Sequence, residues 1–274
     1  MKYVARAADG TPLLGDDDGF VPLNAADPAL ETVEDALKRA PDGLPDPADA
    51  TAERVAADDL AFGFPLDQPG KLWGIGLNYA DHAEDLDEVR PEEPASFIKP
   101  PSVAAGPDTP IRLPPMDVTD RVTAEAELGV VLGRTCSNVP EDDFESVVAG
   151  FVPIIDMTSE DILERNPRFL TRAKSFDTFL VAGPYIAVPE NVSEFLDQVA
   201  VRTVVNDDVV SENTLDGMLF KPPELLNYLS QSTTFQPGDV ISTGTPGAGV
   251  IEDGDTARAE VEPIADLETD VVRQ

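Results

Sequence analysis

Residues 122–133 read VTAEAELGVVLG, and this stretch decides the fold that the sequence predicts. The apolar run Leu128–Leu132, which Gly133 follows, favours a β-strand buried on both faces. Side chains alternate along a strand, so Glu125 and Glu127 point to the same side. Adjacent buried carboxylates repel each other, and a hard cation is the simplest group that keeps both ionised. The alternative is a solvated acidic pair in an acidic protein.

The charge balance is extreme, with 53 acidic against 19 basic residues and a formal net charge of −34. Only six of the basic residues are lysines, and acidic residues occur in nearly every predicted loop, for example at 15–19 and 141–143. Scattered acidic charge with few lysines suggests a surface adapted to high salt, where screening weakens self-repulsion. The same charge argues against nucleic acid and anionic membranes as partners.

We therefore expect a halophilic protein, whose stability and activity rise from low salt to molar KCl because ions screen the repulsion between its carboxylates. Refolding and activity measured over that range test this expectation. Full stability without added salt would count against it.

Cysteine content and hydropathy indicate the cellular compartment in which the protein is expected. The single cysteine, Cys136, excludes an internal disulfide. No apolar segment follows Met1-Lys2-Tyr3, and no run approaches about 18 apolar residues. We therefore expect a soluble, cytoplasmic protein.

The 274 residues suffice for one large domain, or for one domain with a small appendage. We predict a small N-terminal domain over 1–68, with a hairpin around Asp9-Gly10, and a catalytic domain over 69–274. The second part contains predicted strands at 72–77, 96–98, 125–133, 150–156, 179–188, 201–206, 238–244 and 256–262, with a helix at 223–230 and a polar lid segment at 158–170. Many short strands with few helices favour a β-rich α+β fold over a βαβ nucleotide fold.

Four stretches of this second part form one pattern. They are Gly76-Leu77-Asn78-Tyr79-x-x-His82, Phe97-x-Lys99-Pro100, Glu125-x-Glu127-Leu128 with Asp156 downstream, and Thr243-Gly244-Thr245-Pro246. In order and spacing they resemble the fumarylacetoacetate hydrolase family over roughly residues 71–262. The resemblance implies a mixed β-sandwich roll of that type and a homodimer. The apolar stretch 176–188, which is long for a surface segment, also favours a dimer.

The resemblance implies a divalent-metal site formed by Glu125, Glu127 and Asp156. Oxygen ligands suit Mg²⁺, Mn²⁺ or Ca²⁺, and open positions would admit a bidentate 2-oxo acid as the small-molecule substrate. The alternative role for Asp156 is the N-cap of a helix that begins at residues 157–159.

His82 is the only histidine in the chain, and therefore the only side chain whose unperturbed pKa lies near neutrality. In proteins that this chain resembles, the matching histidine activates water or shuttles protons with a glutamate three residues later. Here Asp85 holds that position and Glu84 precedes it. Residues i and i+3 are neighbours on a helical turn, so we assign the orienting role to Asp85. The alternative is a surface histidine in a charged loop.

Lys174 lies in the sequence AKSFD, which resembles a family stretch whose lysine contacts the substrate or stabilises an enolate. The resemblance also implies substrate contacts from Tyr79, Lys99, Thr245 and the backbone of Gly244.

Two positions depart from the family pattern. Many members have an arginine four residues after the third metal ligand and a glutamine three residues later, where this chain has Glu160 and Leu163. An anionic glutamate cannot hold a substrate carboxylate, so an arginine of the lid, at 165, 168 or 172, would have to replace it. The sequence NPRFL at 166–170 resembles the branch that dehydrates 2-keto-3-deoxy sugar acids, although the acid of that branch is missing at residues 95–96.

The leading hypothesis is a metal-dependent enzyme that acts on a 2-oxo acid through a metal-bound enolate. It would hydrolyse the C–C bond of an acylpyruvate, with His82 and Asp85 activating water. Dehydration of a 2-keto-3-deoxy sugar acid, decarboxylation of oxaloacetate and isomerisation of a dienoate share the enolate and are the alternatives. The non-enzyme alternative is a catalytically silent metal-binding homologue, which Glu160 favours and the retained Lys174 opposes.

Overall fold

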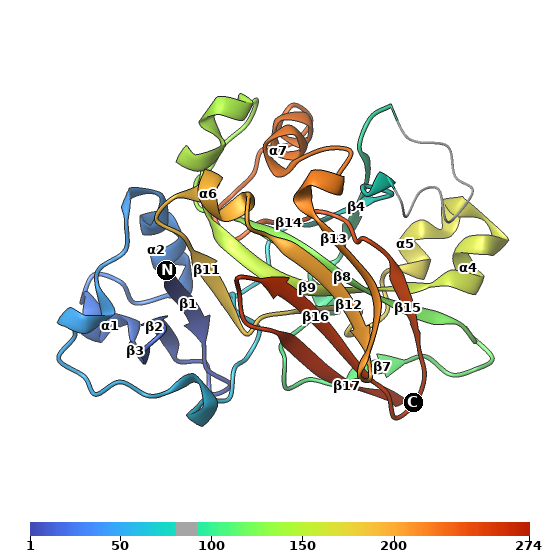
Figure 1. The fold of residues 1–274 in the computed structure, drawn as a ribbon, viewed down its shortest axis with the longest axis horizontal. Coiled ribbons are helices and arrows are strands. Elements are labelled where there is room, and N and C mark those ends of the chain that lie inside the picture. Colours follow the sequence, from blue (N-terminus) through green and yellow to red (C-terminus); the bar gives the residue numbers. More distant parts are fainter. Residues whose placement is uncertain (81–91) are drawn as a thin grey trace.

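The computed structural model describes residues 1–80 and 92–274 (Figure 1). Its strands form a 12-stranded mixed sheet and a five-stranded mixed sheet. The two sheets pack face to face, with β12 and β16 of the smaller sheet against β8 of the larger one. This strand-rich α+β arrangement confirms the predicted fold class.

The large sheet follows the order β3-β2-β1-β11-β9-β8-β14-β4-β5, and β6, β10 and β15 pair beside this path. Its strands are β1 (Lys2–Arg6), β2 (Pro12–Asp16), β3 (Gly19–Pro22), β4 (Leu72–Gly76), β5 (Ala95–Lys99), β6 (Ala104–Ala105), β8 (Val122–Leu132), β9 (Val148–Ser159), β10 (Leu180–Ala182), β11 (Tyr185–Val188), β14 (Val240–Ser242) and β15 (Ala248–Ile251). The small sheet, in the order β13-β12-β16-β17-β7, contains β7 (Ile111–Leu113), β12 (Ala200–Val205), β13 (Asp208–Thr214), β16 (Thr256–Glu262) and β17 (Leu267–Arg273).

The helices of the described residues are short and lie around the sheets (Figure 1). They are α1 (Leu23–Ala26), α2 (Val33–Arg39), α4 (Glu160–Arg165), α5 (Leu170–Ala173), α6 (Val192–Leu196) and α7 (Pro222–Ser230), with 3₁₀ turns at Ala40–Asp42, Pro47–Asp49, Ala57–Asp59, Pro101–Val103, Glu141–Ser146, Pro167–Phe169 and Leu215–Gly217. In the part of the chain that is described, no helix is long and apolar enough to cross a membrane.

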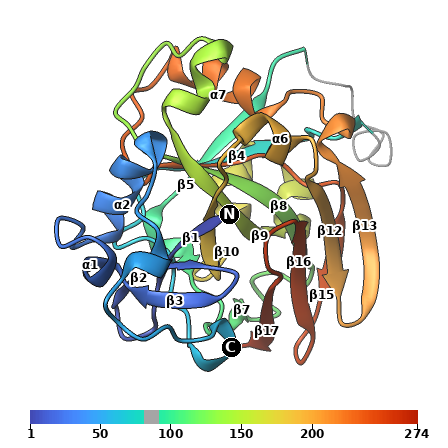
Figure 2. The same ribbon diagram turned by 60° about the vertical axis from the view of Figure 1, so that its left-hand side comes forward.

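The central pair of strands is β8 and β9, which run antiparallel, and every residue in both strands is buried. Alternate residues of β8 serve two different faces. Ala124, Ala126 and Leu128 belong to the core that β8 shares with the second sheet, whereas Val131 packs in the core beneath the N-terminal strands. In Figure 2 the N-terminal strands and the second sheet lie to either side of β9.

The N-terminal hairpin forms as predicted from β1 and β2, and it extends the large sheet because β1 pairs antiparallel with β11. Helix α2 begins at Val33, because Thr32 and Asp35 form a capping box there. The boundary between residues 68 and 69 stays a prediction.

Several strands differ from the sequence prediction. β9 continues to Ser159, so Asp156 lies inside a strand rather than at its end or at a helix N-cap. The apolar run 179–188 divides into β10 and β11, both buried within this chain, so the hydrophobic argument for a dimer does not hold. The prediction missed β3, β6, β7, β13, β15 and β17; the last lies between β16 and β7, and its buried residues alternate with exposed ones.

Candidate metal and substrate site

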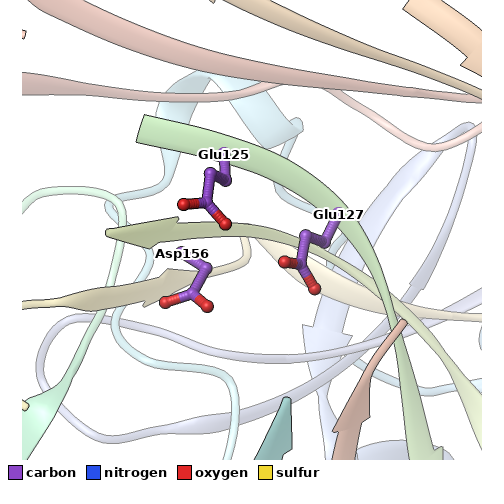
Figure 3. Close-up of side chains that lie close together, drawn as sticks. All are labelled: Glu125, Glu127 and Asp156. Atoms are coloured by element: carbon purple, nitrogen blue, oxygen red, sulfur yellow. The ribbon is translucent and has the colours of Figure 1, made fainter. Parts of the chain in front are cut away.

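The side chains of Glu125, Glu127 and Asp156 gather on one face of the central strand pair (Figure 3). One carboxylate oxygen from each lies within 4.8 Å of the others, and all three residues are buried. Glu125 stands directly opposite Asp156 in the β8–β9 register, and Glu127 is two residues further along β8. The same-face prediction for the glutamates agrees with this geometry, and the cross-strand register supplies the third carboxylate.

The packing of β8 explains why the glutamates face the site. The intervening residue Ala126 points into the core between the two sheets, and its backbone N–H donates to the Thr203 hydroxyl of β12 at 3.0 Å. Because side chains alternate, this packing holds both glutamates on the opposite face.

Glu127 faces a break between two neighbouring strands, β14 and β15. The loop across this break carries Gly244, whose backbone N–H donates to Glu127 Oε2 at 2.8 Å, and the Ser242 hydroxyl donates to the same oxygen at 2.5 Å. Gly244 has φ +96°, and a Cβ there would lie 2.8 Å from Cβ of Asn78. Asn78 in turn holds the loop through its side-chain N–H, which donates to the Thr243 carbonyl at 2.7 Å.

Two buried lysines contact the carboxylates. Lys174 Nζ lies 2.9 Å from Glu125 Oε2 and 2.9 Å from Asp156 Oδ2, and it stands 5.0 Å from the centre of the Phe97 ring. Lys99 Nζ donates to Asp156 and, at 2.6 Å, to the Phe179 carbonyl. Three carboxylates therefore share two ammonium groups, which leaves one negative charge uncompensated when all are ionised.

The two glutamates differ in their pKa. Burial raises the pKa of Glu125, but the Lys174 ammonium and the Thr158 hydroxyl outweigh this effect and lower it below the usual value. Burial raises the pKa of Glu127 to about 7 against the opposing effect of Lys174, and repulsion by Glu125 adds to the increase.

We expect the affinity for Mn²⁺ to rise about tenfold per pH unit up to pH 7, and then to level off, because a proton must leave Glu127 before a cation binds. In the metal-free protein the raised pKa stabilises the fold fully below about pH 4.5, and this contribution is lost as the pH rises through about 7. Calorimetric titration with Mn²⁺ from pH 5.5 to 8.5 measures the affinity. A constant affinity over that range would contradict the prediction.

The donor set fits a hard divalent cation. All three candidate ligands are carboxylate oxygens, and the uncompensated negative charge favours a cation. Such a site suits Mg²⁺, Mn²⁺ or Ca²⁺ better than a thiolate-preferring metal.

The other residues that the sequence assigned to the site have different surroundings. Tyr79 is fully buried, its hydroxyl has no hydrogen bond to a described residue, and burial together with the charge of Glu127 raises its pKa. The Thr245 hydroxyl donates to the Gly247 carbonyl at 2.9 Å, within its own loop. His82 and Asp85 lie outside the described residues.

Sequence reasoning missed the supporting hydroxyl groups of Ser242, Thr158 and Thr123. The Thr158 hydroxyl donates to Glu125, and the Thr123 hydroxyl donates to Glu160 Oε1 at 3.1 Å. Thr123 precedes Glu125 by two residues, so the same alternation that paired the glutamates could have placed it on the site face. The sequence identified Glu160 only as a departure from the family pattern and did not predict its contact with Thr123.

The chain belongs to the fumarylacetoacetate hydrolase family. The family described as "Fumarylacetoacetate (FAA) hydrolase C-terminal" matches residues 71–272. An uncharacterised protein of Archaeoglobus fulgidus is 39% identical over 206 residues, which cover 75% of this chain and 80% of the relative. The mitochondrial oxaloacetate tautomerase fahd2 of Xenopus laevis is 32% identical over 276 residues, which cover 94% of this chain and 84% of that protein.

A solved structure has the same fold across its whole length. The maleylpyruvate hydrolase from Sphingobium sp. SYK-6, in complex with a manganese(II) ion and pyruvate, superimposes with a TM-score of 0.78 at 25% identity, and the match covers 99% of each chain.

Proposed function

We propose that this protein is a divalent-metal-dependent enzyme that acts on a 2-oxo acid through an enolate. The observation that carries the proposal is the buried triad of Glu125, Glu127 and Asp156, with the Lys174 ammonium in contact with two of its carboxylates. The manganese and pyruvate in the structure of the maleylpyruvate hydrolase support the same class of ligand.

The triad would hold Mg²⁺ or Mn²⁺, and the ion would supply Lewis-acid stabilisation of the negative charge on a chelated 2-oxo acid. Lys174, whose ammonium group contacts Glu125 and Asp156, would hold or transfer a proton at the bound substrate. Lys99 fixes the orientation of Asp156, and the hydroxyl of Tyr79, which has no hydrogen bond to a described residue, would donate to a ligand oxygen near Glu127.

The leading reaction is hydrolysis of the C–C bond of an acylpyruvate. Water adds to the distal carbonyl carbon, the adjacent C–C bond breaks, and its electron pair forms the enolate of pyruvate, which takes up a proton. His82, oriented by Asp85, would remove the proton from water. The products are pyruvate and a carboxylic acid.

Isomerisation or tautomerisation of a 2-oxo acid is the second candidate. Lys174 favours it, because an amine beside the triad can move a proton at C3 without activating water. The Xenopus relative that is named an oxaloacetate tautomerase also supports it. Dehydration of a sugar acid would form an enolate by loss of the C3 proton before the C4 hydroxyl leaves, and decarboxylation of oxaloacetate would form the enolate of pyruvate as CO₂ leaves.

A panel of 2-oxo acids incubated with the protein and Mg²⁺ or Mn²⁺, followed by mass spectrometry, tests the proposal. An acylpyruvate that yields pyruvate, with uptake of ¹⁸O from labelled water into the acid product, supports hydrolysis. A product of unchanged mass and altered ultraviolet absorption supports isomerisation. Absence of turnover and of deuterium exchange at C3 across the panel would contradict both.

His82→Gln is expected to reduce kcat/KM for hydrolysis by about 10²-fold while metal binding is retained, because the variant loses the base that activates water. Steady-state kinetics and Mn²⁺ calorimetry on the same preparation measure the two quantities. The pH profile of the wild-type protein should follow the titration of its single imidazole NMR signal. Near-normal turnover of the variant would transfer the proton chemistry to Lys174 and favour isomerisation or dehydration.

The homodimer is also a proposal. It is supported by an exposed apolar group on the outer strand of the second sheet and on neighbouring β15, formed by Val209, Val210 and Val250. Light scattering in high salt should show twice the chain mass of 29.3 kDa. A single species at the chain mass would refute the dimer.

A further inference from the structure

Glu160 places a fourth carboxylate beside the triad. It is the first residue of α4, its backbone N–H donates to the Arg121 carbonyl at 3.0 Å, and its Oε1 accepts from the Thr123 hydroxyl at 3.1 Å. Thr123 and Glu125 are two residues apart on β8 and therefore share a face. The contact with Thr123 thus brings the Glu160 carboxylate to the triad face, next to Glu125.

The triad has a closed end and an open end. At the closed end, Glu127 is 1% exposed, its Oε2 accepts from Ser242 and Gly244, and the neighbouring Tyr79 is fully buried. At the other end, Glu125 is 8% exposed and Glu160 is only half-buried, although Thr123 between them on the same face is 3% exposed. Among the described residues, the side of Glu160 is therefore the more exposed end of the triad, and the tail of a ligand held by the triad would extend there.

The charges at the open end are unfavourable for a second anion. Lys174 already contacts Glu125 and Asp156, and the Arg121 guanidinium reaches Glu164 at 3.5 Å. Within residues 1–80 and 92–274, the carboxylate of Glu160 has no ion-pair partner, and its Oε2 accepts no hydrogen bond. Burial and the charge of Glu125 raise the pKa of Glu160, which agrees with a carboxylate that lies close to another carboxylate.

We infer that Glu160 makes this site prefer 2-oxo acids whose tail is uncharged and carries hydroxyl groups over 2-oxo acids that carry a second carboxylate. A hydroxyl can donate to the free oxygen of Glu160, whereas a tail carboxylate would meet a like charge in a partly buried place. The repulsion excludes one substrate class and the hydrogen bond favours the other. The inference rests on the proposed function, because it requires the triad to hold the 2-oxo acid head.

Binding of two matched ligands tests the inference without knowledge of the reaction. The ligands are 2-oxoglutarate and 5-hydroxy-2-oxopentanoate, which differ only in a terminal carboxylate against a terminal hydroxymethyl group. Calorimetry gives the Kd of each for the Mn²⁺-loaded wild-type protein. We expect the hydroxylated ligand to bind roughly tenfold more tightly, as a like-charge contact near the protein surface predicts.

Two substitutions and one control assign the preference to Glu160. Glu160→Gln should bring the ratio of the two Kd values close to one, and Glu160→Arg should invert it. Glu145→Gln removes the same charge at an exposed position outside the site, and it should leave the ratio unchanged.

Pyruvate, which has no tail, distinguishes a failure of the proposed function from a failure of the inference about Glu160. If pyruvate does not bind the Mn²⁺-loaded protein, the proposed function fails. If pyruvate binds and the wild-type protein holds 2-oxoglutarate at least as tightly as the hydroxylated ligand, the inference about Glu160 fails, whether or not the variants fold. That result would assign the tail contact to the exposed lid arginines Arg168 and Arg172.

Discussion

Glu127→Ala is expected to abolish both divalent-metal binding and activity. The substitution removes one of the three candidate carboxylate ligands, and the ammonium groups of Lys99 and Lys174 would then balance the two carboxylates that remain. A dication would gain little by entering a site that is already neutral, and it would have to displace Lys174 from both of its partners. Calorimetry with Mn²⁺ and a turnover assay on the same sample measure the two losses.

Glu145→Ala is the matched control, because it removes an exposed carboxylate outside the site. It should bind metal and turn over substrate like the wild-type protein. Glu127→Gln, which keeps the shape of the side chain, guards against a loss that comes from misfolding, and circular dichroism checks the fold of each variant. Stoichiometric metal retained by Glu127→Ala would remove Glu127 from the ligand set.

Lys174→Met should lower turnover without lowering the affinity for the metal. We expect turnover to fall by about 10³-fold, within the range that a positioned acid–base group contributes, while the affinity for Mn²⁺ stays constant or rises. The affinity should not fall, because the ammonium competes with a cation for Glu125 Oε2 and Asp156 Oδ2. Stopped-flow or steady-state turnover and metal calorimetry separate the two quantities.

Lys221→Met is the control for this substitution, since Lys221 is an exposed lysine that pairs with Asp216. It should change neither quantity. Near-normal turnover of Lys174→Met would leave Lys174 as a structural counter-ion and move the proton chemistry elsewhere. Loss of metal binding would show that the ammonium stabilises the arrangement of the carboxylates.

The site face of β8 could be predicted because alternation is a local property of a strand. Two glutamates separated by one alanine, ahead of a continuous apolar run, have few other arrangements that bury the run. The family pattern extended this prediction to Asp156, Lys99 and Lys174. The structure describes these five side chains in one contiguous set of contacts.

Other parts depend on long-range packing that no local pattern encodes. β14 pairs with residues 129–131 of β8, and β15 pairs with residues 122–125 of the same strand. The break that receives Glu127 is the gap between these two paired segments. The length of the apolar stretch 176–188 favoured an intersubunit surface, but most of this stretch forms β10 and β11, which are buried in the chain's own large sheet. The position of Glu160 depends on where α4 begins after β9, which the sequence prediction ended three residues early.

The two-faced use of β8 has a consequence for how such a protein can evolve. Deleting or inserting one residue within the strand would exchange its faces, so that alanines would point at the cation site and carboxylates would enter the core between the sheets. Point substitutions, by contrast, change one face and leave the other intact. New specificities should therefore arise through exchanges at the rim, at positions such as 160, and through length changes in the surrounding loops, while the length of the central strand stays fixed.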